Sequence, residues 1–188
     1  MNALIDRKVW VGAIHQPGGE SRKKVVLAAL ENGFDTVVLD KKDHELAKLG
    51  RFRSILLDGA DFVEDGERVG RLVEIAKKSD EVAAKRAAER FQNVIVSAKD
   101  WKVIPLENLI VHFQGTGAKL LMLARTAEEA RLFFETMERG ADGVLFVPSR
   151  LEELAKLRRM LEEGAPRLQM QEGKITVLRQ LGLGDRVC

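Results

Sequence analysis

Short apolar runs alternate with segments of helical periodicity along most of this chain. The apolar runs have the length of buried strands and fall at residues 9–14, 36–39, 54–57, 60–63, 93–97, 119–124 and 143–147. The segments between them carry apolar side chains three and four positions apart, as amphipathic helices do, at residues 20–32, 43–49, 80–91, 127–137 and 150–161. Such alternation of strands and helices predicts an α/β fold with a parallel sheet.

One further segment, residues 68–76, fits either a strand or the start of a helix, and we predict a strand. Counting it, the chain has eight candidate strands in parallel-type units. We therefore predict a compact (β/α)8-like barrel in which some helices are reduced. An open doubly wound α/β sheet is the alternative architecture.

Two helix starts carry a recognisable signal. Thr126 with Glu129, and Ser149 with Glu152, both match the T/S-x-x-E capping box. Gly140 is expected to end the first of these two helices, because glycine is common just beyond a helix C-terminus.

The character of the chain changes after Gly164. Residues 167–170 and 175–178 are separated by a Glu-Gly turn and predict a β-hairpin. We therefore divide the chain into a barrel-like domain, residues 1–164, and the start of a β-rich domain, residues 165–188.

Composition narrows the class of protein. The chain has 45% hydrophobic and 32% charged residues, and its 31 basic and 29 acidic residues alternate in sign, so neither a disordered chain nor a nucleic-acid binder is indicated. No apolar run approaches the roughly 18 residues that span a membrane. The single cysteine, Cys188, and the three histidines show no disulfide or metal spacing, which favours a cytoplasmic protein without a histidine metal site.

Chemistry-bearing residues concentrate in the connection after the strand at residues 93–97. It reads D-W-x-x-I-P-L-E-N-L-I at residues 100–110, and two further motifs follow: E-x-G-x-D-G-V-L at residues 138–145 and G-x-G-D-R-V-C at residues 182–188. In this order and spacing the three motifs resemble the archaeal-type 3-dehydroquinate synthases, also called dehydroquinate synthase II. The resemblance extends over nearly the whole chain from about Lys8 onward.

The resemblance implies an NAD-dependent enzyme. Members of this family oxidatively deaminate a small sugar acid, 2-amino-3,7-dideoxy-D-threo-hept-6-ulosonate, and cyclise it to 3-dehydroquinate in the shikimate route to aromatic amino acids. Relatives in secondary metabolism form an aminohydroxybenzoate, and a divalent metal ion is implied if the chain belongs to that branch. Family members continue past the last motif, so an inactive, truncated binding domain is a further alternative. The oligomeric state stays open.

The chemistry that the resemblance implies needs a base, a cofactor that accepts a hydride, and a group that holds the substrate carboxylate. In a barrel these groups are expected after the C-terminal ends of strands. As catalytic residues we propose four side chains of the 99–110 connection: Lys99, Asp100, Glu107 and Asn108. The structural alternative is that they cap a turn, complement a helix dipole and tie down backbone.

Binding roles are assigned to five further residues. Arg125, Asp185 and Arg186 are expected to hold the substrate, and Asp40 and Asp58 the NAD. Asp40 follows a strand, as does the acidic residue that binds ribose hydroxyls in dinucleotide sites. Because residues 12–19 do not fit G-x-G-x-x-G, a Rossmann-type site is not supported, and a helix-start role for Asp40 is favoured.

Overall fold

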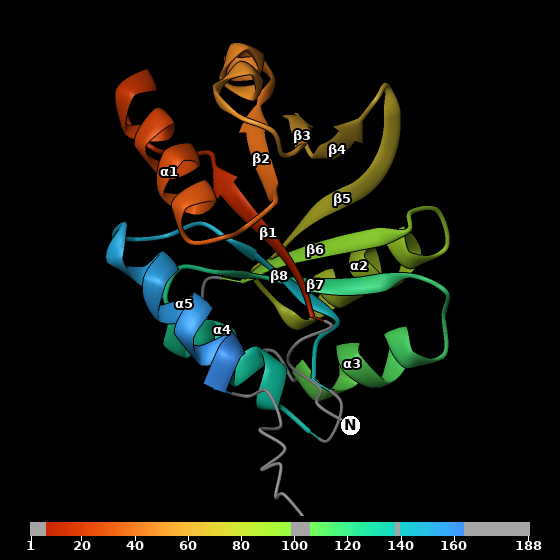
Figure 1. Ribbon diagram of the computed structural model, residues 1–188. Coiled ribbons are helices and arrows are strands. Elements are labelled where there is room, and N and C mark those ends of the chain that lie inside the picture. Colours follow the sequence, from red (N-terminus) through yellow and green to blue (C-terminus); the bar gives the residue numbers. More distant parts are fainter. Residues whose placement is uncertain (1–6, 99–105, 138–139, 164–188) are drawn as a thin grey trace, which may run out of the picture.

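The chain folds into an eight-stranded barrel surrounded by helices on part of its circumference (Figure 1). The structure is a computed structural model that describes residues 7–98, 106–137 and 140–163. The strands are β1 (Lys8–Ala13), β2 (Thr36–Asp40), β3 (Arg53–Asp58), β4 (Asp61–Glu64), β5 (Glu67–Ile75), β6 (Asn93–Ala98), β7 (Lys119–Ala124) and β8 (Gly143–Phe146). The helices are α1 (Gly19–Glu31), α2 (Glu81–Ala88), α3 (Leu106–Gln114), α4 (Ala127–Glu135) and α5 (Glu152–Glu163), with two 3₁₀ helices, η1 (Lys41–Leu49) and η2 (Lys78–Asp80).

The sheet closes on itself, so the predicted barrel is confirmed and the open doubly wound sheet is wrong. The strands follow one another in chain order, and β8 pairs in parallel with β1, for example Leu145 beside Trp10. One part of the prediction fails: β4 is antiparallel to both β3 and β5, not a parallel unit. Tight turns join these three strands, which leaves no room for the helices that a parallel connection requires.

Two apolar cores stabilise the barrel, one inside it and one between it and the helices. Inside, side chains from alternate strand positions meet, and this interior cluster consists of Trp10, Ile14, Val38, Ile55, Leu57, Phe62, Ile95, Leu121, Leu145 and Val147, with Val69, Leu72 and Leu123 packed against it. The opposite faces of the strands pack against the helices. This alternation is the period-two pattern of a strand that is covered on both faces.

The N-terminal end of the barrel is closed by a layer of charged and amide side chains. The Lys8 ammonium donates to the Asn93 amide oxygen at 2.7 Å, and Arg53 pairs with Glu64. Burial lowers the pKa of Lys8, and the nearby positive charges of Arg53 and Lys119 lower it further. In barrels of this type the N-terminal face contributes to stability.

The predicted helix signals are confirmed in one case and wrong in the other. Thr126 is the N-cap of α4, and its hydroxyl accepts a hydrogen bond from the Glu129 N–H at 3.2 Å. Ser149 does not cap α5: that helix begins only at Glu152, and the Ser149 N–H instead donates to the Arg125 carbonyl oxygen. A hydrogen bond between the loops after β7 and β8 is found here in place of the expected helix cap.

Other predictions divide between those confirmed and those outside the described residues. The ambiguous segment at residues 68–76 is a strand, as predicted, because β5 occupies it. The short helix expected at residues 43–49 has 3₁₀ geometry and starts two residues earlier. The predicted β-hairpin and the second domain, residues 165–188, lie outside the described residues.

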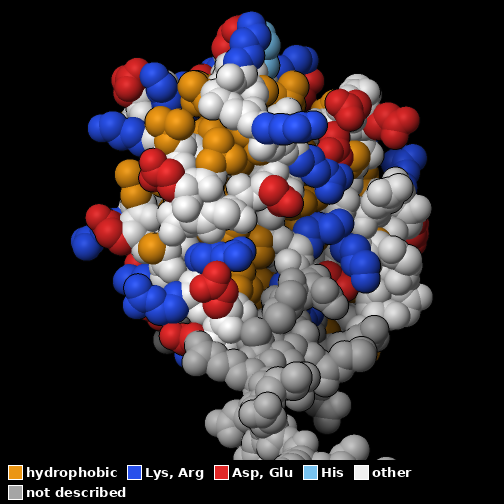
Figure 2. Space-filling view, viewed as in Figure 1, with side chains coloured by type: hydrophobic (Ala, Val, Ile, Leu, Met, Phe, Trp, Pro, Cys, Tyr) orange, Lys and Arg blue, Asp and Glu red, His pale blue; other side chains and the backbone are white. Residues whose placement is uncertain are grey.

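The surface mixes both signs of charge, as the sequence predicts. Lysine and arginine side chains intermingle with aspartate and glutamate over the viewed face (Figure 2). Within the described ranges no helix is long and apolar enough to cross a membrane.

Candidate functional site

Polar side chains gather where the parallel strands end. We call this end the barrel mouth: the C-terminal ends of β1, β2, β3 and β5 to β8, with the loops that follow them. Every second side chain of a strand faces the same side of the sheet. Polar side chains that lie two positions after a member of the interior cluster, or after a residue packed against it, therefore face the inside of the barrel at the mouth. Four residues meet this condition: Asp40, Glu74, Ser97 and Arg125. Two carboxylates, a hydroxyl and a guanidinium thus share this end of the barrel.

The two carboxylates predicted to bind the cofactor lie at the ends of neighbouring strands, Asp40 at the end of β2 and Asp58 at the end of β3. Asp40 is the N-cap of η1, as the helix-start interpretation predicts, and its carboxylate accepts a hydrogen bond from the Lys42 N–H at 3.3 Å. The same carboxylate lies 3.4 Å from the Lys42 ammonium. Asp58 pairs with the Lys41 ammonium at 2.6 Å. These lysines and carboxylates are partly or largely exposed, so each pair is worth at most about 1 kcal/mol and opens easily for a ligand.

Arg125 stands just past the end of β7 with a fixed backbone and an exposed side chain. Its N–H donates to the Glu129 carboxylate at 2.7 Å, and its carbonyl oxygen accepts from the Ser149 N–H at 3.0 Å. In the part of the chain that the structure describes, the Arg125 guanidinium makes no ion pair. A cation held in this way is suited to binding a carboxylate or phosphate.

The loops after β8, β1 and β2 are joined by one hydrogen-bonded network. The Gln16 amide donates to the Pro148 carbonyl oxygen at 3.1 Å, and the Gln16 carbonyl oxygen accepts from the Arg22 guanidinium at 2.9 Å. Arg22 also forms an ion pair with Asp43, with 2.6 Å between Nε and Oδ2 and side-chain exposures of 12% and 13%. This network fixes one side of the barrel mouth.

The other side is fixed by a buried carboxylate of α5. Glu153, 6% exposed, accepts from the Ala127 N–H at 2.9 Å and from the Lys156 ammonium at 2.6 Å. The hydrogen bond from Lys156, followed by that from Ala127, lowers the pKa of Glu153. The first turn of α4, directly after Arg125, is thereby anchored to α5.

Of the four predicted catalytic residues, the structure describes two. Glu107 and Asn108 lie in the first turn of α3, which follows β6, and both are exposed. Glu107 therefore has the position near the helix N-terminus that the sequence predicts, where the helix dipole favours a carboxylate. Lys99 and Asp100 lie outside the described residues, as do the predicted substrate-binding residues Asp185 and Arg186.

Three polar residues near the mouth were missed by the sequence analysis. Glu74 and Ser97 could have been found by extending the period-two alternation of β5 and β6 to the strand ends. Glu81, in the first turn of α2, is 5% exposed, and one of its carboxylate oxygens has no hydrogen-bond partner within the described ranges. Its spacing from Ala84 and Ala88 on one helix face was the available signal.

The loop between β5 and α2 is shaped by an aspartate. The Asp80 carboxylate accepts from the Ala76 and Lys77 N–H groups at 3.0 and 3.1 Å. These bonds, that from Ala76 first, lower the pKa of Asp80. The carboxylate therefore serves the turn after β5 and is not available as a base.

A metal centre finds no support in the described part of the chain. Across residues 7–98, 106–137 and 140–163, no three histidine, cysteine, aspartate or glutamate side chains gather in a way that could hold a metal ion. Asp40 and Asp58 pair with Lys42 and Lys41.

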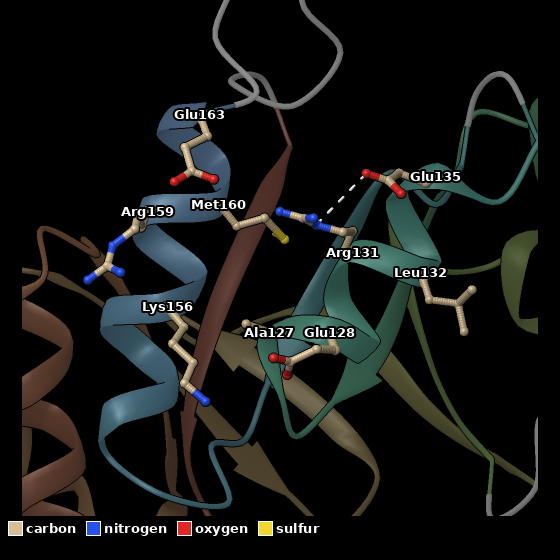
Figure 3. A pocket seen from close by; sticks show the side chains of 9 residues that line it. All are labelled: Ala127, Glu128, Arg131, Leu132, Glu135, Lys156, Arg159, Met160 and Glu163. Carbon is tan, nitrogen blue, oxygen red and sulfur yellow. Dashed lines mark ion pairs between the residues drawn. The ribbon is translucent and has the colours of Figure 1, made fainter.

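A cavity elsewhere on the barrel does not belong to the mouth. It lies between α4 and α5 on the outside of the barrel and has a volume of about 440 Å³ (Figure 3). Its charged side chains are balanced, with three cationic and three acidic residues: Arg131, Lys156, Arg159, Glu128, Glu135 and Glu163.

Comparison with known families assigns most of the chain. Residues 6–161 match the family described as the 3-dehydroquinate synthase II N-terminal domain. No solved structure shows a significant match to the chain.

Curated relatives bear the same enzyme name. The chain is 36% identical to the 3-dehydroquinate synthase of Methanocorpusculum labreanum, a match that covers 96% of this chain and 52% of the relative. It is 32% identical to the enzyme of that name from Methanocaldococcus jannaschii, over 95% of this chain and 55% of the relative. A 3-dehydroquinate synthase homolog of Persephonella marina is 32% identical, over 88% and 48%. The chain spans about half the length of these relatives.

Proposed function

Because the chain belongs to the 3-dehydroquinate synthase II family, we propose that it forms the barrel of an NAD-dependent 3-dehydroquinate synthase. The match over residues 6–161 is the observation that carries this proposal. The reaction is the oxidative deamination of 2-amino-3,7-dideoxy-D-threo-hept-6-ulosonate, followed by cyclisation to 3-dehydroquinate. The product then serves the synthesis of aromatic amino acids.

In this proposal Arg125 binds the substrate carboxylate. Its guanidinium is exposed at the mouth and makes no ion pair with the residues that the structure describes, so binding the substrate requires no existing bond to break. Its backbone is held on both sides by Glu129 and Ser149. A guanidinium and a carboxylate can form two parallel hydrogen bonds, which orient the substrate as well as hold it.

The residues at the ends of β2 and β3 fit a dinucleotide in their chemistry. Asp40 and Asp58 can accept hydrogen bonds from ribose hydroxyls, and Lys41 and Lys42 can neutralise the phosphates once the exposed ion pairs open. NAD supplies a hydride acceptor when it is bound. The carboxylates and lysines of this chain only bind and orient it.

Proton transfer is proposed for residues near α3. Glu107 and Asn108 are exposed in the first turn of that helix, at the same end of the barrel as Arg125. In this proposal Glu107 orients the substrate ammonium from its position in the first turn of α3. Lys99 and Asp100 remain the proposed proton-transfer groups.

The proposal is tested by adding the aminoheptulosonate and NAD to a full-length version of the protein and following the absorbance of NADH and the release of ammonia. We expect both to appear and Arg125→Met to raise KM for the aminoheptulosonate. The control Arg159→Met removes another exposed arginine, from the cavity between α4 and α5 outside the mouth, and should leave KM unchanged. If calorimetry detects binding of an acid metabolite but no binding of NAD, the chain is a non-catalytic binding domain and the proposal is overturned.

A further inference from the structure

A second groove lies between β5 and α2, beside the barrel mouth, and has a volume of about 720 Å³. We call it the β5–α2 groove. Four arginines and one carboxylate line it, above an apolar floor: Arg68, Arg71, Arg86, Arg90 and Glu74. This volume falls within the range of small-molecule sites.

The groove exists because the barrel is irregular at this point. Tight turns connect β3, β4 and β5, so the helix that would precede β5 in a regular barrel is missing. The short β4 pairs with β5 only as far as Arg71, and residues 72–75 of β5 have no strand partner on that side. The gap between β5 and α2 is therefore a permanent feature of the fold.

Arginines outnumber carboxylates by four to one along the groove. Arg68 and Arg71 share a further carboxylate, that of Asp61, at 3.4 and 2.7 Å. Arg86 lies in the last turn of α2 and Arg90 just after the helix, and neither makes an ion pair with any residue that the structure describes. Like charges that line one groove repel each other, so the native chain tolerates a cost that a bound anion would remove.

The floor of the groove is apolar and partly aromatic. Val73 and Ala87 are buried there, and the Arg71 guanidinium lies 5.9 Å from the centre of the Phe91 ring. The planar guanidinium of arginine can donate two parallel hydrogen bonds to the oxygens of a phosphate, and the apolar floor can pack against the carbon atoms of the same ligand. A long polyanion is disfavoured, because charges of both signs are mixed over the face that Figure 2 shows.

We propose that the β5–α2 groove binds a small organic phosphate. The phosphate lies against Arg86 and Arg90, and the organic part packs on Phe91 and Ala87. This site goes beyond the proposed function, because its arginines lie on α2 and directly after it, outside the barrel, and the aminoheptulosonate carries no phosphate.

The test is calorimetry on the 188-residue chain with phenyl phosphate, inorganic phosphate and phenol as probes. We expect phenyl phosphate to bind more tightly than inorganic phosphate, binding to weaken as salt is added, and phenol to give no heat. The variant R86Q/R90Q should weaken binding of phenyl phosphate by about tenfold or more, because two charge-assisted contacts are lost.

The matched control is R131Q/R159Q, which removes the same charge from the balanced α4–α5 cavity (Figure 3). It should bind phenyl phosphate as the parent chain does. Equal losses in both variants would show a general charge effect and overturn the proposal. So would equal binding of inorganic and phenyl phosphate, or tighter binding of a single-stranded oligonucleotide. Phe91→Leu, which retains the arginines, should weaken phenyl phosphate but not inorganic phosphate.

Discussion

Replacing Glu153 by alanine should destabilise the barrel through a helix to which Glu153 does not belong. The Glu153 carboxylate accepts from the Ala127 N–H at 2.9 Å, at the first position of α4, and Ala127 itself is only 5% exposed. An N–H of the first helical turn has no partner within its own helix. Losing its acceptor in a buried place costs about 1–3 kcal/mol, whereas the exposed ion pair with Lys156 adds at most about 1 kcal/mol.

Urea unfolding measures this difference directly. Glu153→Ala should lower the midpoint by an amount that corresponds to about 2 kcal/mol with an unchanged m value. Glu153→Gln keeps an acceptor oxygen and should lose less. The control Glu152→Ala removes the exposed neighbour on the same helix and should change stability by less than about 0.5 kcal/mol. If Glu153→Ala and Glu152→Ala were equally stable, the Ala127 bond would not anchor α4.

Three further predictions concern pH, the barrel mouth and close packing. The pKa of Glu153 is lower in the folded chain than in the unfolded chain, where it is roughly 4.3. The stability that the Glu153 carboxylate contributes is therefore complete above roughly pH 4.3 and is lost as the pH falls through the folded pKa. The difference in urea midpoint between Glu153→Ala and the parent chain should shrink on acidification. Arg22→Met removes the cation that pairs with the nearly buried Asp43 carboxylate, and should lower the free energy of unfolding, measured with urea, by roughly 3 kcal/mol. The double variant with Asp43→Leu should recover part of this stability. Gly143→Ala would place a Cβ against the backbone of β1 and should cost about 3 kcal/mol in the same assay, whereas Gly117→Ala, in open space, should cost less than about 0.5 kcal/mol.

The barrel could be predicted from the sequence because its strands are buried on both faces. Continuous apolar runs such as residues 93–97 and 119–124 mark such strands clearly, and the segments between them have helical spacing. The antiparallel β4 was missed because its short apolar run has the same appearance in either direction. Direction depends on the turns at residues 59–60 and 65–66, which are too short for a crossover.

The candidate site could be predicted only in part. Asp40 and Arg125 were found because each directly follows an apolar run. Glu74 was missed because its segment fits either a strand or a helix, and the period-two alternation that places it inside the barrel applies only once the segment is known to be a strand. Ser149 shows the opposite error: its local pattern fits a helix cap, but its N–H is used in a tertiary contact with Arg125 that no local pattern can reveal.

The central claim is that this chain belongs to an NAD-dependent 3-dehydroquinate synthase whose chemistry lies at the barrel mouth. The most direct test measures NADH formation from NAD and the aminoheptulosonate by a full-length version of the protein and by its Arg125→Met variant. We expect NADH and ammonia in equal amounts, with a raised KM for the aminoheptulosonate in the variant. A folded full-length protein that forms no NADH, or a variant with unchanged KM, would contradict the claim.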